Sequence, residues 1–111
     1  MDLLNELNQK CRELDTQVSN LKVTGSALAK AERNYKVKLR QECLKLKEEK
    51  MAVTLIDKVC YGIEEVANLR EKRDYADAIY KANQESINST KLQIRILQSQ
   101  IDKEWGLSKN G

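Results

Sequence analysis

The chain of 111 residues contains no proline, no phenylalanine and no histidine, and it has only four glycines. Proline and glycine are the residues that most often interrupt helices, so their scarcity favours long continuous helices over an extensive sheet. With charged residues at 33% and aromatic residues at 5%, the chain suits a narrow helical seam better than a thick globular core. The composition therefore predicts one elongated all-α domain.

The cysteines are few, and their spacing is uninformative. Cys11, Cys43 and Cys60 are an odd set without Cys-x-x-Cys spacing and without histidine, so they predict neither a zinc site nor a disulfide framework. The N-terminus lacks a secretory pattern, and no apolar run approaches membrane length. We therefore expect a soluble, cytoplasmic protein with reduced cysteines, no metal, no cofactor and no membrane association.

Motifs of catalysis are also missing. The sequence has no glycine-rich phosphate loop and no nucleophile motif, and its carboxylates are spread along predicted helices. Acid–base chemistry needs carboxylates that converge, so we expect no catalytic residues and a protein that is not an enzyme.

The strongest positive signal is a repeat at alternating steps of three and four residues over 63–105, the spacing of a coiled-coil seam. The repeat comprises Val66, Leu69, Arg73, Ala76, Tyr80, Asn83, Ile87, Thr90, Ile94, Leu97, Ile101 and Glu104. No proline or glycine lies within it, which predicts one helix of roughly 43 residues, about 64 Å long at 1.5 Å per residue. A helix of that length with an apolar stripe needs a partner.

A second repeat of the same spacing begins at Leu4 and predicts a helix over about 2–49, with Asp2 either as its N-cap or as a negative charge at the positive end of the helix dipole. Gly25 is the weak point of this helix. The register continues on both sides of the glycine, which favours a continuous helix, although a bend at Gly25 stays open.

Between the long helices, Thr54 resembles an N-cap, and a short helix over about 54–61 is expected to end at Gly62. Gly106 is expected to end the last helix at about residue 105, leaving a frayed tail over 106–111.

Folding the chain about its middle predicts an antiparallel, coiled-coil-like hairpin with a short helix at its tip. This arithmetic opposes Leu46 with Val66, Val18 with Ile94, Gly25 with Ile87, and Leu7 with Trp105. The predicted core or oligomer seam comprises Leu14, Val18, Leu21, Tyr80, Ile87, Ile94, Leu97 and Ile101. Because the second long helix also carries apolar residues outside its seam, we expect hairpins to pair into a dimer or larger helical bundle.

Three groups of residues are candidate contact surfaces. A basic flank on the first helix, a candidate contact for an acidic protein or nucleic acid, comprises Arg33, Lys36, Arg40 and Lys47. A candidate ligand pocket between paired hairpins comprises Arg73, Tyr80 and Lys81, although an ion pair between Arg73 and Glu42 is the favoured interpretation of that arginine. A candidate docking tip on the short helix comprises Leu55, Ile56 and Tyr61.

Several segments also carry a resemblance, namely 31–37 (AERNYKV), 54–56 (TLI), 65–70 (EVANLR), 87–97 (INSTKLQIRIL) and 104–106 (EWG). They resemble a family of small, mostly uncharacterised helical proteins encoded in the early regions of bacteriophages and prophages of Gram-positive bacteria. The resemblance covers roughly residues 31–106 and implies a role in replication, recombination or the disarming of host defence. It implies no site residues.

These observations favour a non-enzymatic, homo-oligomeric phage accessory protein that binds a host or phage protein, such as a component of host defence. One alternative is a nucleic-acid-binding accessory of recombination or replication that uses the basic flank. Another is sequestration of a small signalling nucleotide between paired hairpins.

Overall fold

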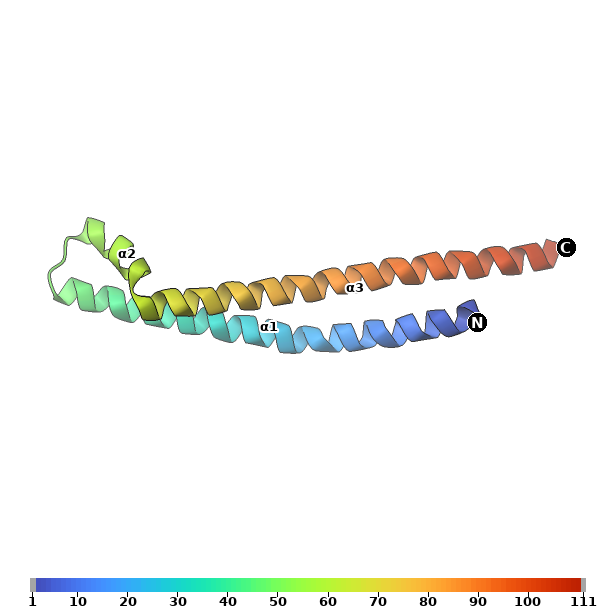
Figure 1. Cartoon of the computed structure of the whole chain (residues 1–111), viewed down its shortest axis with the longest axis horizontal. Helices are drawn as coiled ribbons and strands as arrows, with labels where there is room; N and C mark the ends of the chain where they lie inside the picture. The colour runs from blue at the N-terminus through green and yellow to red at the C-terminus, as the bar shows by residue number, and fades with distance from the viewer. Residues whose placement is uncertain (1, 111) are drawn as a thin grey trace. The chain divides into compact units, whose positions relative to one another are not determined.

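The computed structural model describes the backbone of residues 2–110 and the side chains of residues 2–106. Within this part of the chain there are three helices: α1 (Leu3–Glu48), α2 (Val53–Gly62) and α3 (Glu64–Asn110). The predicted all-α fold is confirmed: two long helices pack against each other, and a short helix lies between them in the order of the chain (Figure 1). No helix among the described residues is long and apolar enough to cross a membrane.

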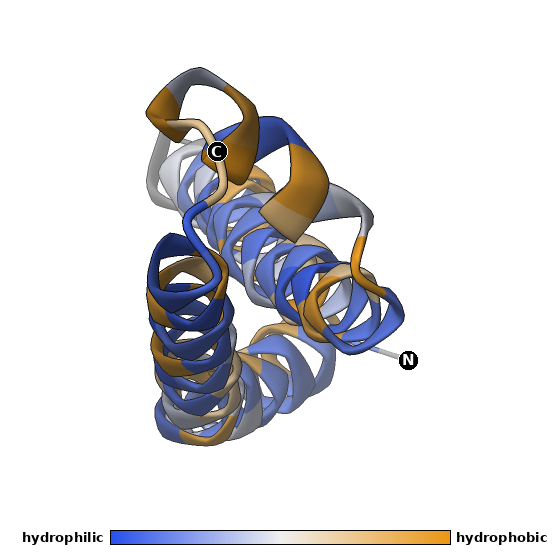
Figure 2. Cartoon of the chain, turned by 90° about the vertical axis from the view of Figure 1, so that its left-hand side faces the viewer, coloured by the Kyte–Doolittle hydropathy of each residue, from blue (hydrophilic) through white to orange (hydrophobic). Residues whose placement is uncertain are grey.

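The chain divides into two compact units, which are described separately. The terminal unit pairs residues 3–23 of α1 with residues 81–110 of α3, and the central unit comprises residues 24–80. In both units α1 and α3 run antiparallel. Hydrophobic residues recur along helices that are otherwise hydrophilic, as the repeats predict (Figure 2).

The start of α1 follows its predicted chemistry. The Asn5 N–H donates to Asp2 Oδ1 at 2.9 Å, which is the N-cap bond expected of Asp2. The helix continues through Gly25, which has no positive φ, so the prediction of a continuous helix is confirmed.

The end of α1 is a Schellman motif. Lys50 lies in the left-handed region with φ 63°, its N–H bonds the Lys47 carbonyl at 3.0 Å, and the Met51 N–H bonds the Leu46 carbonyl at 3.1 Å. This pair of bonds satisfies carbonyls at the helix end. A lysine occupies the position that glycine usually takes, so some backbone strain is stored there.

Two predicted boundaries are wrong. Thr54 is not the N-cap of α2, because the helix begins at Val53 after Ala52, and no side chain bonds its first turn. Gly106 does not end α3, which continues to Asn110, since a glycine in the ordinary helical region weakens a helix without stopping it. The predicted frayed tail over 106–111 is wrong for the backbone of residues 106–110, which is helical; the side chains of 107–110 and residue 111 lie outside the described part of the chain.

The predicted pairing of α1 with α3 in the central unit is wrong by about one heptad. Tyr80, not Ile87, lies against Gly25, with its ring 3.4 Å from the position of an added Cβ. At the other end of the unit, Lys38 Nζ lies 2.6 Å from Glu65 Oε2, so Val66 does not oppose Leu46.

The central unit also differs from the prediction in the place of α2, which folds back along the last turns of α1. Cys60 on α2 contacts Cys43 on α1, with the sulfur atoms 2.9 Å apart, and Ile56 packs beside Leu44. The last turns of α1 therefore pack against α2, and α3 begins opposite Lys38. The core of the central unit takes side chains from all three helices: Tyr35, Ile56, Cys60 and Val66.

The core of the terminal unit is mostly the predicted α3 stripe. Asn83, Ile87, Thr90, Leu97 and Ile101 are buried, while Ile94, Leu14 and Leu21 are half-buried. Asn83 and Thr90 are polar members of this core, and Asn83 Nδ2 donates to the Gln17 carbonyl at 3.1 Å. A buried amide needs such a partner, and this bond places Gln17 in the seam.

The face that α1 turns inward in the terminal unit differs from the predicted one. Half-buried Lys10 and Gln17 flank the Leu7–Leu14–Leu21 row, whereas Cys11 and Val18 are exposed. Val18 is 47% exposed and does not fill the seam position predicted opposite Ile94. Trp105 is also on the surface, 63% exposed, and does not pack beside Leu7 as predicted.

Candidate partner-binding groove

A groove runs between α1 and α2 in the central unit. One of its pockets has a volume of about 220 Å³ and is lined by Arg40, Cys43, Leu44, Lys47 and Ile56. The cysteine, the leucine and the isoleucine provide an apolar floor, and the arginine and the lysine provide a cationic rim. Leu44 is 48% exposed, so this floor is open to solvent.

A second pocket of about 330 Å³ shares Arg40 and Cys43 with the first. Its other lining residues are Lys36, Leu39 and Asp57. Because they share two residues, the two pockets adjoin, and together they form the α1–α2 groove. Three cationic side chains and one carboxylate border this groove, which gives its rim a positive excess.

The structure brings two of the predicted surfaces together in this groove. The α1–α2 groove is lined by three residues of the basic flank, namely Lys36, Arg40 and Lys47. The fourth, Arg33, lines a neighbouring pocket of about 390 Å³ together with Lys36. All four side chains are exposed. Lys36 also lies 3.4 Å from Glu32, a surface ion pair of small energetic value that leaves the lysine accessible.

The predicted docking tip is divided by the fold. Leu55 and Tyr61 are each 50% exposed, whereas Ile56 is only 8% exposed and contributes to the groove floor. Val53 and Val59 are exposed on the same short helix. α2 therefore buries one apolar edge against α1 and presents another to solvent.

Contacts with Tyr61 hold the C-terminal end of α2. The Arg70 guanidinium lies 4.9 Å from the Tyr61 ring centroid, and Arg70 Nη1 donates to the Tyr61 carbonyl at 3.1 Å. A hydrogen bond with Tyr35 raises the pKa of Tyr61 above its ordinary value. These contacts tie α2 to both long helices and keep the groove formed.

Arg73 does not form the predicted ion pair with Glu42. Its guanidinium lies 4.5 Å from the Tyr35 ring centroid, and Nη2 lies 2.9 Å from Asp74 Oδ1. Glu42 instead lies 3.1 Å from Lys38 and 3.3 Å from Lys45. The heptad shift explains this difference, because it moves Arg73 toward Tyr35.

The ligand pocket predicted between paired hairpins needs a second chain and stays a prediction; within one chain, Arg73 and Tyr80 lie in the central unit and Lys81 lies in the terminal unit. Arg73 lines a pocket of about 280 Å³ together with Leu28 and three carboxylates, Glu32, Asp74 and Asp77. Carboxylates repel a phosphate, so this lining is unfavourable for a nucleotide. Tyr80 packs on Gly25, and Lys81 is exposed.

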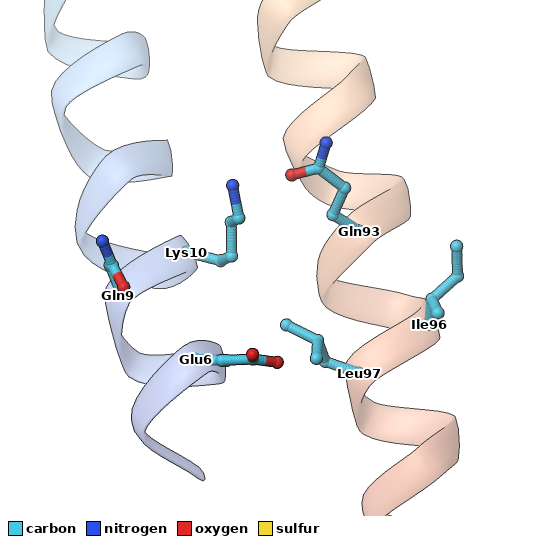
Figure 3. Close-up of a pocket in the computed structure, with 6 residues that line it drawn as sticks. All are labelled: Glu6, Gln9, Lys10, Gln93, Ile96 and Leu97. Carbon is cyan, nitrogen blue, oxygen red and sulfur yellow. The ribbon is translucent and has the colours of Figure 1, made fainter. Parts of the chain in front are cut away.

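The terminal unit has a larger pocket of about 450 Å³ between α1 and α3, lined by Glu6, Gln9, Lys10, Gln93, Ile96 and Leu97. Figure 3 shows Glu6 directed toward Leu97 across this space, with Ile96 directed away. Lys10 Nζ already lies 3.1 Å from Glu13. The lining thus offers no converging charge that would select a ligand.

The contact between Cys43 and Cys60 was missed by sequence reasoning. The signal was present, since each cysteine lies on the apolar side of its own helix near the chain reversal. Only a short helix that folds back brings the two together, and the sequence pattern had placed that helix at the end of the seam.

Among the described residues, no group of three or more His, Cys, Asp or Glu side chains is placed to hold a metal ion. Comparisons of the chain with protein-family models, with curated proteins and with solved structures found no match.

Proposed function

We propose that this protein acts by binding another protein through the α1–α2 groove, and that it is a phage accessory protein without enzymatic activity. The observation that carries the proposal is the construction of the groove, in which an apolar floor of Cys43, Leu44 and Ile56 lies beneath the cationic rim of Arg40 and Lys47.

The groove chemistry defines the partner. An apolar side chain that covers the exposed part of Leu44 removes apolar surface from water, which favours binding by roughly 25 cal/mol per Å². Acidic residues beside that side chain would face Lys36, Arg40 and Lys47 and would speed association. The expected ligand is a segment with a bulky apolar residue flanked by aspartate or glutamate.

The biological setting rests on the resemblance of residues 31–106 to proteins from early phage regions. In that setting the partner is a host or phage protein, such as a component of host defence. Interference with a host complex requires only tight occupation of a surface, so it is compatible with a protein that performs no chemistry.

Selection from a random peptide display library tests the groove chemistry directly. We expect wild-type protein to enrich peptides with a bulky apolar residue next to acidic residues, and the Arg40→Glu/Lys47→Glu variant to lose them. Lys22→Glu is the matched control, because Lys22 is an exposed cation on α1 outside the groove. Enrichment that is equal on wild type and the groove variant would refute the proposal.

A pull-down from bacterial cells then tests the partner. A protein retained by wild type and Lys22→Glu, but lost with both Leu44→Asp and Arg40→Glu, is the expected result. Two variants are needed because one changes the floor and the other the rim.

Nucleic-acid binding by the basic flank is the alternative with some structural support, since Arg33, Lys36, Arg40 and Lys47 are all exposed. Glu32 and Asp57 are interspersed among them and weaken a phosphate track. Binding to duplex DNA that falls steeply with salt and disappears in Arg40→Glu, together with no peptide enrichment, would favour this alternative.

A further inference from the structure

Cys43 and Cys60 are a preformed dithiol. Their sulfur atoms are 2.9 Å apart, although the residues lie on different helices, and both are free thiols. A disulfide bond is about 2.05 Å long, so the sulfur atoms need to approach by only about 1 Å to be joined.

The two thiols differ in access. Cys43 is half-buried and lines both pockets of the α1–α2 groove, so it borders the space that a small molecule in the groove would occupy. Cys60 is fully buried, and this burial raises the pKa of its thiol. Attack on an external disulfide therefore begins at Cys43, with Cys60 held in place to resolve the product.

We propose that Cys43 and Cys60 form a reversible disulfide by exchange with anionic low-molecular-weight disulfides, and that this bond locks α2 onto α1. In the first step the Cys43 thiolate attacks one sulfur of the small disulfide, forming a mixed disulfide and releasing one thiolate. In the second step Cys60 Sγ attacks Cys43 Sγ, the mixed disulfide breaks, and the Cys60 proton passes to the second leaving sulfur, which departs as a thiol. Two cysteine thiols are oxidised, and one small disulfide is reduced to two thiols.

The preference for an anionic oxidant follows from the groove rim. Arg40 lines both pockets that Cys43 lines. Lys47 also lines the first pocket, and Lys36 also lines the second. Asp57 contributes one carboxylate to the lining of the second pocket. A positively charged cleft raises the local concentration of anions. Oxidised glutathione carries a net negative charge, whereas cystamine is a dication, so the two reagents separate charge selection from simple access.

The consequence of the bond is mechanical. Cys43 and Cys60 are separated by 17 positions in sequence, and the segment between them contains the end of α1, the connection and most of α2. Closing this loop removes open conformations in which α2 leaves α1. In the oxidised protein α2 is therefore fixed, and the groove keeps one shape.

The primary test uses wild-type protein treated with oxidised glutathione, followed by mass spectrometry and peptide mapping without reductant. The expected product is a Cys43–Cys60 disulfide within one chain, with Cys11 either free or carrying glutathione. Cys11 is the internal control, because it is an exposed thiol without a neighbouring cysteine on α1. Modification of Cys11 while Cys43 and Cys60 remain thiols would overturn the proposal.

Variants test the order of the steps. Cys60→Ala is expected to trap glutathione on Cys43, and Cys43→Ala is expected to leave Cys60 unmodified, with far-UV circular dichroism confirming that each variant is folded. Rapid modification of Cys60 in folded Cys43→Ala would contradict the assignment of Cys43 as the attacking thiol. If either variant unfolds, the wild-type mapping still decides whether the bond forms.

Charge selection is tested by comparing reaction rates with oxidised glutathione and cystamine. For each cysteine we take the rate with oxidised glutathione divided by the rate with cystamine. At low salt we expect this ratio to be about tenfold higher at Cys43 than at Cys11. In Arg40→Glu the ratio at Cys43 should fall. Equal ratios at the two cysteines would refute the anion preference.

Discussion

The Tyr80 ring lies against Gly25, with Cε1 3.4 Å from the position that a Cβ on the glycine would occupy. This is an ordinary van der Waals separation, and Gly25 has no positive φ. An alanine therefore fits at residue 25 without moving the ring. The glycine therefore lowers the stability of the helix, although the Tyr80 ring leaves room for a Cβ at residue 25.

We accordingly expect Gly25→Ala to raise the free energy of unfolding by about 0.5–1 kcal/mol, the difference in helix propensity between the two residues. Urea unfolding followed by circular dichroism measures it. Gly25→Leu provides the contrast, since its larger side chain would collide with Tyr80 and destabilise the protein. Destabilisation by alanine would show that the ring approaches more closely than described.

Lys50 offers a second stabilising change. Its left-handed φ of 63° costs an L-residue roughly 1 kcal/mol, and glycine avoids that cost. Lys50→Gly should therefore raise the free energy of unfolding by up to about 1 kcal/mol. Lys30→Gly, at an exposed position within α1, is the control and should lower it by a similar amount, because glycine is unfavourable inside a helix.

Asn83 tests the polar contact in the terminal unit. Its buried amide donates to the Gln17 carbonyl, so Asn83→Ala should lower the free energy of unfolding by about 1–2 kcal/mol. Asn88 is an exposed asparagine on the same helix, and Asn88→Ala is expected to change stability very little. Equal effects of the two substitutions in chemical denaturation would contradict the described seam.

Glu42 predicts a pH dependence. The hydrogen bond from Lys38, 3.1 Å away, holds the pKa of Glu42 below its ordinary value of 4.5. A carboxylate whose pKa is lower in the folded protein than in the unfolded chain stabilises the fold fully at a pH above its pKa in the unfolded chain. This stabilisation is lost as the pH falls through the pKa of the carboxylate in the folded protein. The free energy of unfolding should therefore decrease as the pH falls below 4.5.

Glu42→Gln should lose less stability than wild type over the same acidic range, because it has no carboxylate to protonate. The exposed Glu71→Gln on α3 is the control for a general change in charge. Parallel pH profiles of Glu42→Gln and wild type would show that the Lys38 contact does not persist in solution.

Exposed apolar residues on α3 support the expectation of an oligomer. Leu92 and Ile96 in the terminal unit are both about half exposed, on the helix whose apolar width led us to expect paired hairpins. Light scattering at micromolar concentration should give a mass above that of one chain for wild type and a smaller mass for Leu92→Glu/Ile96→Glu. A single-chain mass for wild type would refute the expectation.

Much of the fold was predictable because its signals are local. The missing prolines, the heptad steps and the Asp2 cap act within a few residues, so they predicted the fold class, the continuity of α1 through Gly25, and the start of α1. Two boundaries were wrong because Thr54 and Gly106 are residue types that often occur at helix ends but do not have to act there.

The pairing was not predictable to the same degree. A heptad pattern repeats every seven residues, so sliding one helix by a heptad leaves the apolar match almost unchanged. The choice was made by contacts between distant residues: Tyr80 on Gly25, Arg73 on Tyr35 and the Asn83 bond to Gln17. Such contacts depend on side-chain shape and on hydrogen-bond geometry, which periodicity does not contain.

The candidate site divides in the same way. Helical spacing was enough to predict that Arg40 and Lys47 lie on one flank of a helix and that Ile56 and Cys60 belong to an apolar short helix. It did not predict that this short helix packs back onto α1, which joins the cations to an apolar floor and brings Cys43 to Cys60. Packing α2 against α1 removes Ile56 and Cys60 from water, and no local pattern specifies which surface will cover them.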